Sequence, residues 1–111
     1  MAASRAKAVY PDIFHLIGRS ENIREASEAM QAMAHPIRLK ILCLIGSDEL
    51  MVQEIVDAVG TSQSNVSQHL AVMKERGLLV SRRQANKALY RIEDPRILKM
   101  ISLMREIFCS L

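Results

Sequence analysis

The sequence has no tryptophan, few other aromatic residues and no long apolar run. Aromatic residues make up 4% of the chain, whereas methionine occurs seven times, and this composition favours a helical protein over a sheet-rich one. No segment approaches the roughly 18 consecutive apolar residues of a membrane span, and the first residues lead into no apolar signal region. We therefore expect a cytoplasmic protein that has no membrane partner.

Residues that carry chemistry are also scarce. The two cysteines, Cys43 and Cys109, lie 66 positions apart, which is not the pattern of a secreted disulfide framework. His15, His35 and His69 lack the spacing of metal ligands, so we expect neither a metal site nor a cofactor. There is no Cys-x-x-Cys motif, glycine-rich phosphate loop or acid/base constellation. These absences argue against an enzyme, including a thiol oxidoreductase that would use Cys43.

The length of 111 residues fits one domain, which we assign to residues 1–111 with residues 1–20 as an N-terminal extension. Within the extension, Pro11 and Asp12 can open a short helix. Amphipathic helices are predicted over about residues 22–34 and 37–45, and Pro36 suits the first position of the second helix, where its missing N–H costs nothing. The positions of this second helix expected to face a core are Ile37, Ile41, Leu44 and Ile45.

The stretch from Thr61 to Arg76 predicts a helix with one apolar and one polar face. Ser62 is placed to cap its start and Gly77 to end it. A short apolar helix over residues 52–59 precedes it, so the pair predicts a helix-turn-helix. The polar face carries hydroxyls and amides that can approach base edges and phosphates, although such a face can also be merely solvated. The candidate DNA contacts here are Gln63, Ser64, Ser67, Gln68 and His69.

Two segments of strand character, residues 78–83 and 88–92, flank a turn in which we expect Asn86 to take a positive φ. The prediction is a β-hairpin, or wing. Between Thr61 and Arg91 there are six Lys or Arg against one acidic residue, a local excess that is typical of a phosphate-backbone binder. The candidate contacts of the wing with the DNA backbone or minor groove are Arg82, Arg83 and Lys87.

Asp94 and Pro95 open a final helix whose apolar residues cover more than one side. These residues are Ile97, Met100, Ile101, Leu103, Met104, Ile107, Phe108 and Leu111. A terminal helix of this kind predicts packing against its own domain and against a second copy, so we expect a homodimer. A deeply buried terminal helix in a monomer is the alternative.

With Ala34-His35-Pro36-Ile37-Arg38-Leu39-Lys40-Ile41-Leu42 and the Ser-x-His-Leu sequence at residues 67–70 in place, the chain resembles the ArsR/SmtB family of small bacterial repressors. The resemblance spans roughly residues 24–109. It implies a mainly α winged helix-turn-helix with a small β-hairpin, dimeric, with N- and C-terminal helices at the dimer interface. It also implies a repressor that occupies a palindromic site on double-stranded operator DNA and leaves it when an inducer binds.

The chain departs from the metal sensors of that family. Their motif Glu-Leu-Cys-Val-Cys falls on Glu-Leu-Met-Val-Gln at residues 49–53, and the terminal helix contains no histidine. The placement of Cys43 and Cys109 is instead similar to the persulfide-responsive BigR/SqrR branch, in which two such cysteines join through sulfur. This similarity implies reactive sulfur species or oxidation as the inducer, and two small buried hydrophobic residues are the alternative. An antirepressor of this family and a winged-helix module for protein contacts also remain open.

Overall fold

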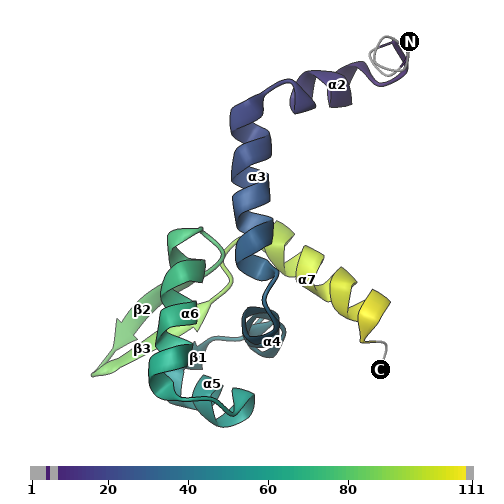
Figure 1. Ribbon diagram of the computed structural model, residues 1–111. Coiled ribbons are helices and arrows are strands. Elements are labelled where there is room, and N and C mark those ends of the chain that lie inside the picture. The colour runs from purple at the N-terminus through teal and green to yellow at the C-terminus, as the bar shows by residue number, and fades with distance from the viewer. Residues whose placement is uncertain (1–4, 6–7, 110–111) are drawn as a thin grey trace.

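The computed structural model describes residues 5 and 8–109, without the side chains of Phe14 and Leu16 (Figure 1). Leu111 and part of the expected N-terminal extension, residues 1–4 and 6–7, lie outside the described residues. Across the described part of the chain, no helix is long and apolar enough to span a membrane. The elements are α2 (Pro11–Ile17), α3 (Ser20–Met33), α4 (Pro36–Ile45), β1 (Leu50–Met51), α5 (Val52–Val59), α6 (Gln63–Glu75), β2 (Val80–Gln84), β3 (Lys87–Arg91) and α7 (Pro95–Phe108).

The ends of the helices follow from local side-chain and backbone chemistry. Pro36 occupies the first position of α4, and the His35 ring caps that helix by accepting the backbone N–H two residues on, at 3.1 Å. Ser62 caps α6, because its Oγ accepts the N–H of Asn65 at 3.1 Å. Beyond α6, Gly77 has a φ of +76°, which glycine adopts without the steric penalty of a Cβ. The predicted cap and stop of this helix are confirmed.

The core lies around α4, which packs against α3, α5, α6 and α7. Because α4 has neighbours on several sides, its buried surface is wider than a single stripe. The expectation for Leu44 is therefore wrong: this side chain is 38% exposed, whereas Leu42 is fully buried. The buried residues are Ala32, Met33, Ile41, Leu42, Ile45, Ile55, Val66, Leu70, Met73, Leu78, Leu79, Ile92 and Ile101.

The wing belongs to a three-stranded antiparallel sheet in the order β1-β3-β2. The two-residue strand β1, which the sequence did not predict, adds to the hairpin through the pairs Leu50↔Tyr90 and Met51↔Leu89. The expected positive φ at Asn86 is wrong, since it is Ala85 that has a φ of +57°. Residues 84 and 87 are paired across the hairpin, so the turn between the strands has only two central residues. The first of these, Ala85, takes the positive φ that reverses the direction of the chain.

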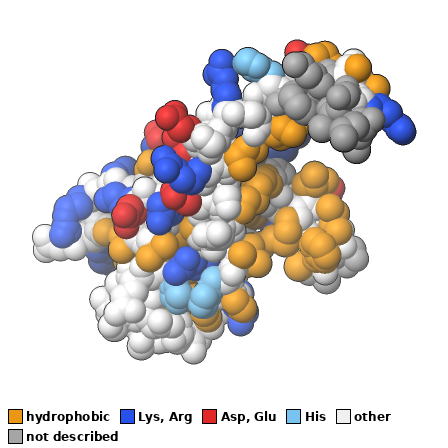
Figure 2. Space-filling model, turned by 45° about the horizontal axis from the view of Figure 1, so that its top comes forward, with side chains coloured by type: hydrophobic (Ala, Val, Ile, Leu, Met, Phe, Trp, Pro, Cys, Tyr) orange, Lys and Arg blue, Asp and Glu red, His pale blue; other side chains and the backbone are white. Residues whose placement is uncertain are grey.

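Helix α7 leaves the core beside the C-terminal end of α3 and carries the chain away from the wing (Figure 1). Ile101 faces the core and is 1% exposed, but Leu103, Ile107 and Phe108 are 55%, 63% and 77% exposed. Figure 2 shows apolar side chains gathered on this side of the molecule. The prediction that α7 is apolar on more than one side is confirmed.

Candidate nucleic-acid interface

Helix α6 divides into a buried and an exposed face. Val66, Leu70 and Met73 are fully buried against the domain, which fixes the orientation of the helix. The opposite face carries only small or uncharged polar side chains over its first two turns. The exposed residues of that face are Gln63, Ser64, Ser67 and Gln68.

His69 lies apart from this exposed set and joins α6 to α4. Its Nδ1 accepts the Nε–H of Arg38 at 3.0 Å, and its ring centroid lies 4.5 Å from that of His35. Arg38 also donates to the carbonyl of Ala32 at 3.3 Å, so one guanidinium connects three helices. No local pattern in the sequence indicates the contact between Arg38 and His69, because these residues are 31 positions apart. Their meeting depends on how α4 and α6 pack.

Burial lowers the pKa of His69 below its ordinary value of 6.5, and repulsion from the protonated form of His35 and from the Arg38 charge lowers it further. The fold thus favours the neutral ring, whose Nδ1 can accept from Arg38. Because the folded pKa lies below the unfolded one, the corresponding stability is fully present above about pH 6.5 and is lost as the pH falls toward the folded value.

The variant His69→Gln keeps an acceptor for Arg38 but cannot gain a proton in this pH range. We expect the melting temperature of the wild-type protein to fall further than that of the variant between about pH 7.5 and pH 5.5. Thermal denaturation followed by circular dichroism measures both falls, and all other titrating groups are common to the two proteins. Equal falls would show that His69 does not contribute to acid sensitivity.

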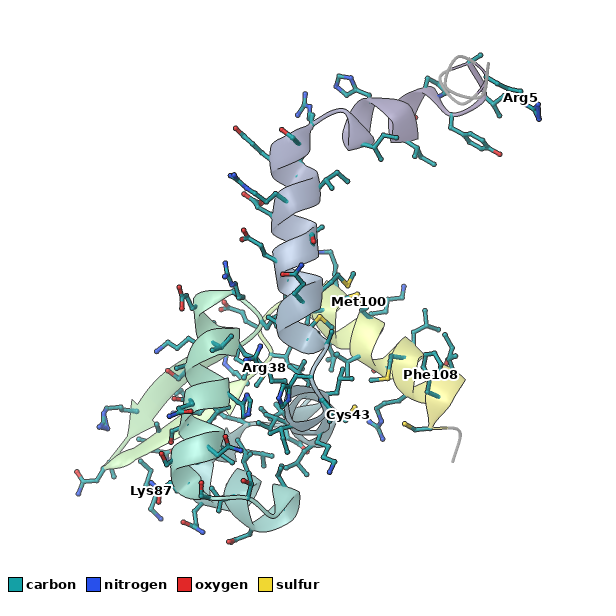
Figure 3. The ribbon with its side chains drawn as sticks, in the orientation of Figure 1. Arg5, Arg38, Cys43, Lys87, Met100 and Phe108 are labelled. Atoms are coloured by element: carbon teal, nitrogen blue, oxygen red, sulfur yellow. The ribbon has the colours of Figure 1, made fainter. Side chains whose placement is uncertain are left out.

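The wing presents its two arginines differently. Successive strand residues point to opposite faces of a sheet, so the side chains of Arg82 and Arg83 leave β2 on opposite faces. Arg83 lines a cleft of about 470 Å³ that also includes Gln63 and Lys87, and this cleft separates the wing from α5 and the start of α6. Lys87 lies at the tip of the wing, beside the N-terminal end of α6 (Figure 3). Of the wing candidates, Arg83 and Lys87 are therefore brought next to the polar face of α6.

Arg82 is paired with Glu49, a contact across 33 positions that no local pattern in the sequence indicates. Its Nε donates to both carboxylate oxygens at 3.0 and 2.9 Å, and its Nη2 lies 2.6 Å from Oε1. The Arg82 guanidinium lowers the pKa of Glu49, chiefly by hydrogen bonding, so the carboxylate stays ionised. Arg91 lies 3.8 Å from the same carboxylate.

Other basic residues of the segment are also engaged within the protein. Arg76 pairs with Glu28 of α3 at 2.9 Å, and Lys74 donates to Ser81 at 2.7 Å. Among the residues that the structure describes, Arg83 and Lys87 have no ion-pair partner within 4.0 Å. Lys74 also keeps its charge, because Ser81 is neutral, so these three residues are the cations of the segment that pair with no carboxylate of the described residues. Arg83 and Lys87 line the cleft, which Glu54 and Asp57 line as well.

The two cysteines are free thiols, and the structure does not bring this predicted pair close together: Cys43 lies on α4 and Cys109 directly follows α7. Cys43 is half-buried on the side of α4 toward α7 (Figure 3). Cys109 is exposed at the C-terminal end of α7. Burial raises the pKa of Cys43, the Arg105 charge opposes this rise, and a thiolate at Cys109 adds to it. Over the described ranges, no three His, Cys, Asp or Glu side chains converge to hold a metal ion.

The fold and the polar, basic face define a winged helix-turn-helix regulator. The sequence profile described as "Bacterial regulatory protein, arsR family" matches residues 35–81. The transcriptional regulator YgaV of Escherichia coli is 37% identical over 86 residues, which cover 77% of this chain and 87% of that protein. The transcriptional activator HlyU of Vibrio cholerae is 35% identical over 90 residues, which cover 81% of this chain and 83% of that protein. The chain belongs to the ArsR family of bacterial regulatory proteins.

Solved structures agree with this assignment. Reduced HlyU from Vibrio cholerae superposes with a TM-score of 0.78 at 34% identity, over 85% of this chain and 99% of that chain. The transcriptional repressor BigR from Xylella fastidiosa gives a TM-score of 0.73 at 26% identity, over 83% and 94% of the two chains. The expected winged helix-turn-helix fold is confirmed. The protein is a transcriptional regulator, and the expectation that it is not an enzyme is confirmed by these relatives.

Proposed function

We propose that this regulator is a homodimeric repressor that reads a palindromic operator with α6 and releases it when reactive sulfur species or oxidation join Cys43 to Cys109. The observation that carries the DNA-binding part is the uncharged polar face of α6 beside the available charges of Arg83 and Lys87. Amides and hydroxyls suit base edges in the major groove, whereas Lys and Arg on a wing suit phosphates. A palindromic site requires two such faces, one from each protomer.

Support for the dimer comes from apolar side chains that one protomer leaves exposed. On α7 these are Leu103, Ile107 and Phe108, and on α3 they include Ile23 and Met30, both more than two-fifths exposed. The described part of the N-terminal extension adds Val9, Tyr10, Ile13 and Ile17. A monomeric protein rarely exposes apolar surface on this scale. A second copy of the chain would cover it, because in a two-fold symmetric dimer the same helices of each protomer pack against those of the other.

Support for the cysteine switch comes from the exposure of the two thiols and from the helices to which they belong. The exposed Cys109 is the accessible thiol for first attack on a sulfur donor, because the raised pKa of Cys43 keeps that thiol protonated. Cys43 can then complete a bridge between α7 and α4. Since α4 also contacts α6, a bridge that changes the packing of α4 acts on the helix that reads DNA.

A bridge with an additional sulfur atom spans a longer gap than a disulfide, which requires Cα atoms within about 7 Å. Two cysteine thiols and two persulfide molecules, RSSH, give a bridging trisulfide, two thiols RSH and one molecule of hydrogen sulfide. One persulfide donates the sulfur atom, and the other accepts the two electrons. Peroxide forms only the shorter disulfide, with release of water. We therefore expect persulfide to join the two cysteines more readily than peroxide does.

The variants Cys43→Ser and Cys109→Ser test this switch. Each should bind operator DNA like the wild-type protein when reduced and should stay bound after persulfide treatment, because neither can form the bridge. Gel-shift titration before and after treatment, with intact-mass and peptide mass spectrometry, measures release and linkage together. Release of DNA by either variant, or a wild-type protein that releases DNA without a link between the cysteines, would contradict the switch.

A second candidate function has one specific observation in its favour, since the similar HlyU is described as a transcriptional activator. In that case the same DNA face would displace another repressor, as an antirepressor does. Deletion of the gene separates the two functions. Transcripts whose promoters the protein binds rise in the deletion strain if it represses directly, and fall if it displaces a repressor.

A further inference from the structure

We propose that Glu49 is a positioning residue of the wing: its carboxylate neutralises and immobilises the Arg82 guanidinium, so that Arg83 and Lys87 alone bring wing charge to DNA. This inference rests on the proposed DNA-binding face. It concerns how strongly the wing attracts phosphates rather than which bases are read.

The geometry of the pair supports a fixed arrangement. Three donor–acceptor distances of 2.6 to 3.0 Å join the Arg82 guanidinium to the Glu49 carboxylate, the side-on arrangement that gives such pairs their strength. Gln84, two residues along β2 and hence on the same face, accepts a further bond from Arg82 Nη2 at 3.4 Å. The Glu49 side chain is only 23% exposed, against 54% for Arg82, so the acid is the anchored partner.

The sheet topology places Glu49 close enough to Arg82 to form this ion pair. It directly precedes β1, whose first pair, Leu50↔Tyr90, sets the register against β3. One strand further, Arg82 pairs with Leu89, the same β3 residue that pairs with Met51. The short strand β1 therefore carries an acidic residue to the base of the wing, beside arginines of both hairpin strands. Arg83 points to the other face and lines the cleft.

The consequence for binding follows from the electrostatics of DNA. Each Lys or Arg that contacts a phosphate strengthens binding to every sequence and adds about 0.9 to the slope of log affinity against log salt. An Arg82 that is already neutralised adds nothing to either quantity. Glu49 thus limits the sequence-independent attraction of the wing.

The test compares single variants and one double variant on a short duplex of arbitrary sequence, by fluorescence anisotropy at several salt concentrations. Glu49→Gln removes the charge but keeps the shape, and we expect tighter binding and a slope steeper by about 0.9 per protomer. That slope corresponds to a roughly 3.5-fold larger loss of affinity between about 50 and 200 mM salt. Arg82→Gln leaves the ionised Glu49 without its main partner and should weaken binding, whereas Glu49→Gln/Arg82→Gln removes both charges and should bind with the affinity and slope of the wild-type protein.

Glu93→Gln is the matched control, because Glu93 is exposed near the wing and contacts Arg91 at 3.5 Å but does not contact Arg82. It should not reproduce the change in slope. Equal effects of Glu49→Gln and Glu93→Gln, or a double variant Glu49→Gln/Arg82→Gln that keeps the gain of Glu49→Gln, would overturn the role of Glu49. If Arg83→Gln and Lys87→Gln also leave the slope unchanged, the wing does not touch DNA and the proposed binding face itself is wrong. Melting temperatures identify any variant that has lost its fold, and the double variant still tests the inference, because it should match the wild-type protein.

Discussion

Replacement of both Ser67 and Gln68 by alanine is expected to abolish specific operator binding while the protein stays folded. Both side chains are exposed on α6, opposite the fully buried Val66 and Leu70, so their loss leaves the core intact. Alanine also favours the helix more than serine does. Each good base contact contributes roughly 1 to 3 kcal/mol of discrimination, so the double variant should lose at least about 30-fold in affinity for its operator.

The operator for this measurement is obtained by selection of bound sequences from a randomised duplex pool with the wild-type protein. Affinity for that operator and for an arbitrary duplex is then compared by anisotropy. The matched control is Ser47→Ala/Gln31→Ala, the same chemical change at exposed positions outside α6. We expect the loss in the α6 variant to be confined to the operator. An unchanged ratio of operator to arbitrary-sequence affinity would mean that another element reads the bases.

The variant Leu103→Glu/Ile107→Glu is expected to dissociate the protein into folded monomers. Both side chains are more than half exposed in the single chain, so glutamate is tolerated there until a second copy covers it. A buried Leu or Ile contributes about 1.5 to 3 kcal/mol, and a homodimer loses four such side chains, so its dissociation constant should rise by at least about ten-thousandfold. Operator affinity should fall with it, because a monomer contacts only one half-site.

Sedimentation velocity at micromolar concentration measures the assembly, and circular dichroism checks the fold. Ala58→Glu, at an exposed position of α5, is the control for added negative charge and should remain dimeric. Ile101→Glu gives a contrast within α7: this residue is 1% exposed in its own domain, so its substitution should lower the melting temperature rather than yield a folded monomer. A wild-type chain that sediments as a monomer would exclude the proposed dimer.

Signals that act over a few residues allowed the sequence to predict much of the helical framework. Pro36 requires no backbone N–H at the start of a helix, and Ser62 reaches an N–H three residues away. The buried stripe of α6 follows from the helical period alone, and so does its exposed polar face. For the same reason the helix-turn-helix and the exposed candidates on α6 could be predicted from the sequence.

Packing between distant segments decided the rest. Leu42 rather than Leu44 is buried because α4 has neighbours on several sides, and β1 is a strand only because β3 lies beside it. The sequence by itself therefore determined which segments are helical, which face of α6 is polar, and that a basic hairpin follows α6. Each of these features depends on residues that are only a few positions apart. Only the tertiary structure decided which charges remain available for DNA. Arg82 meets Glu49 across 33 positions and His69 meets Arg38 across 31, and contacts at such separations are set by three-dimensional packing rather than by spacing along the chain.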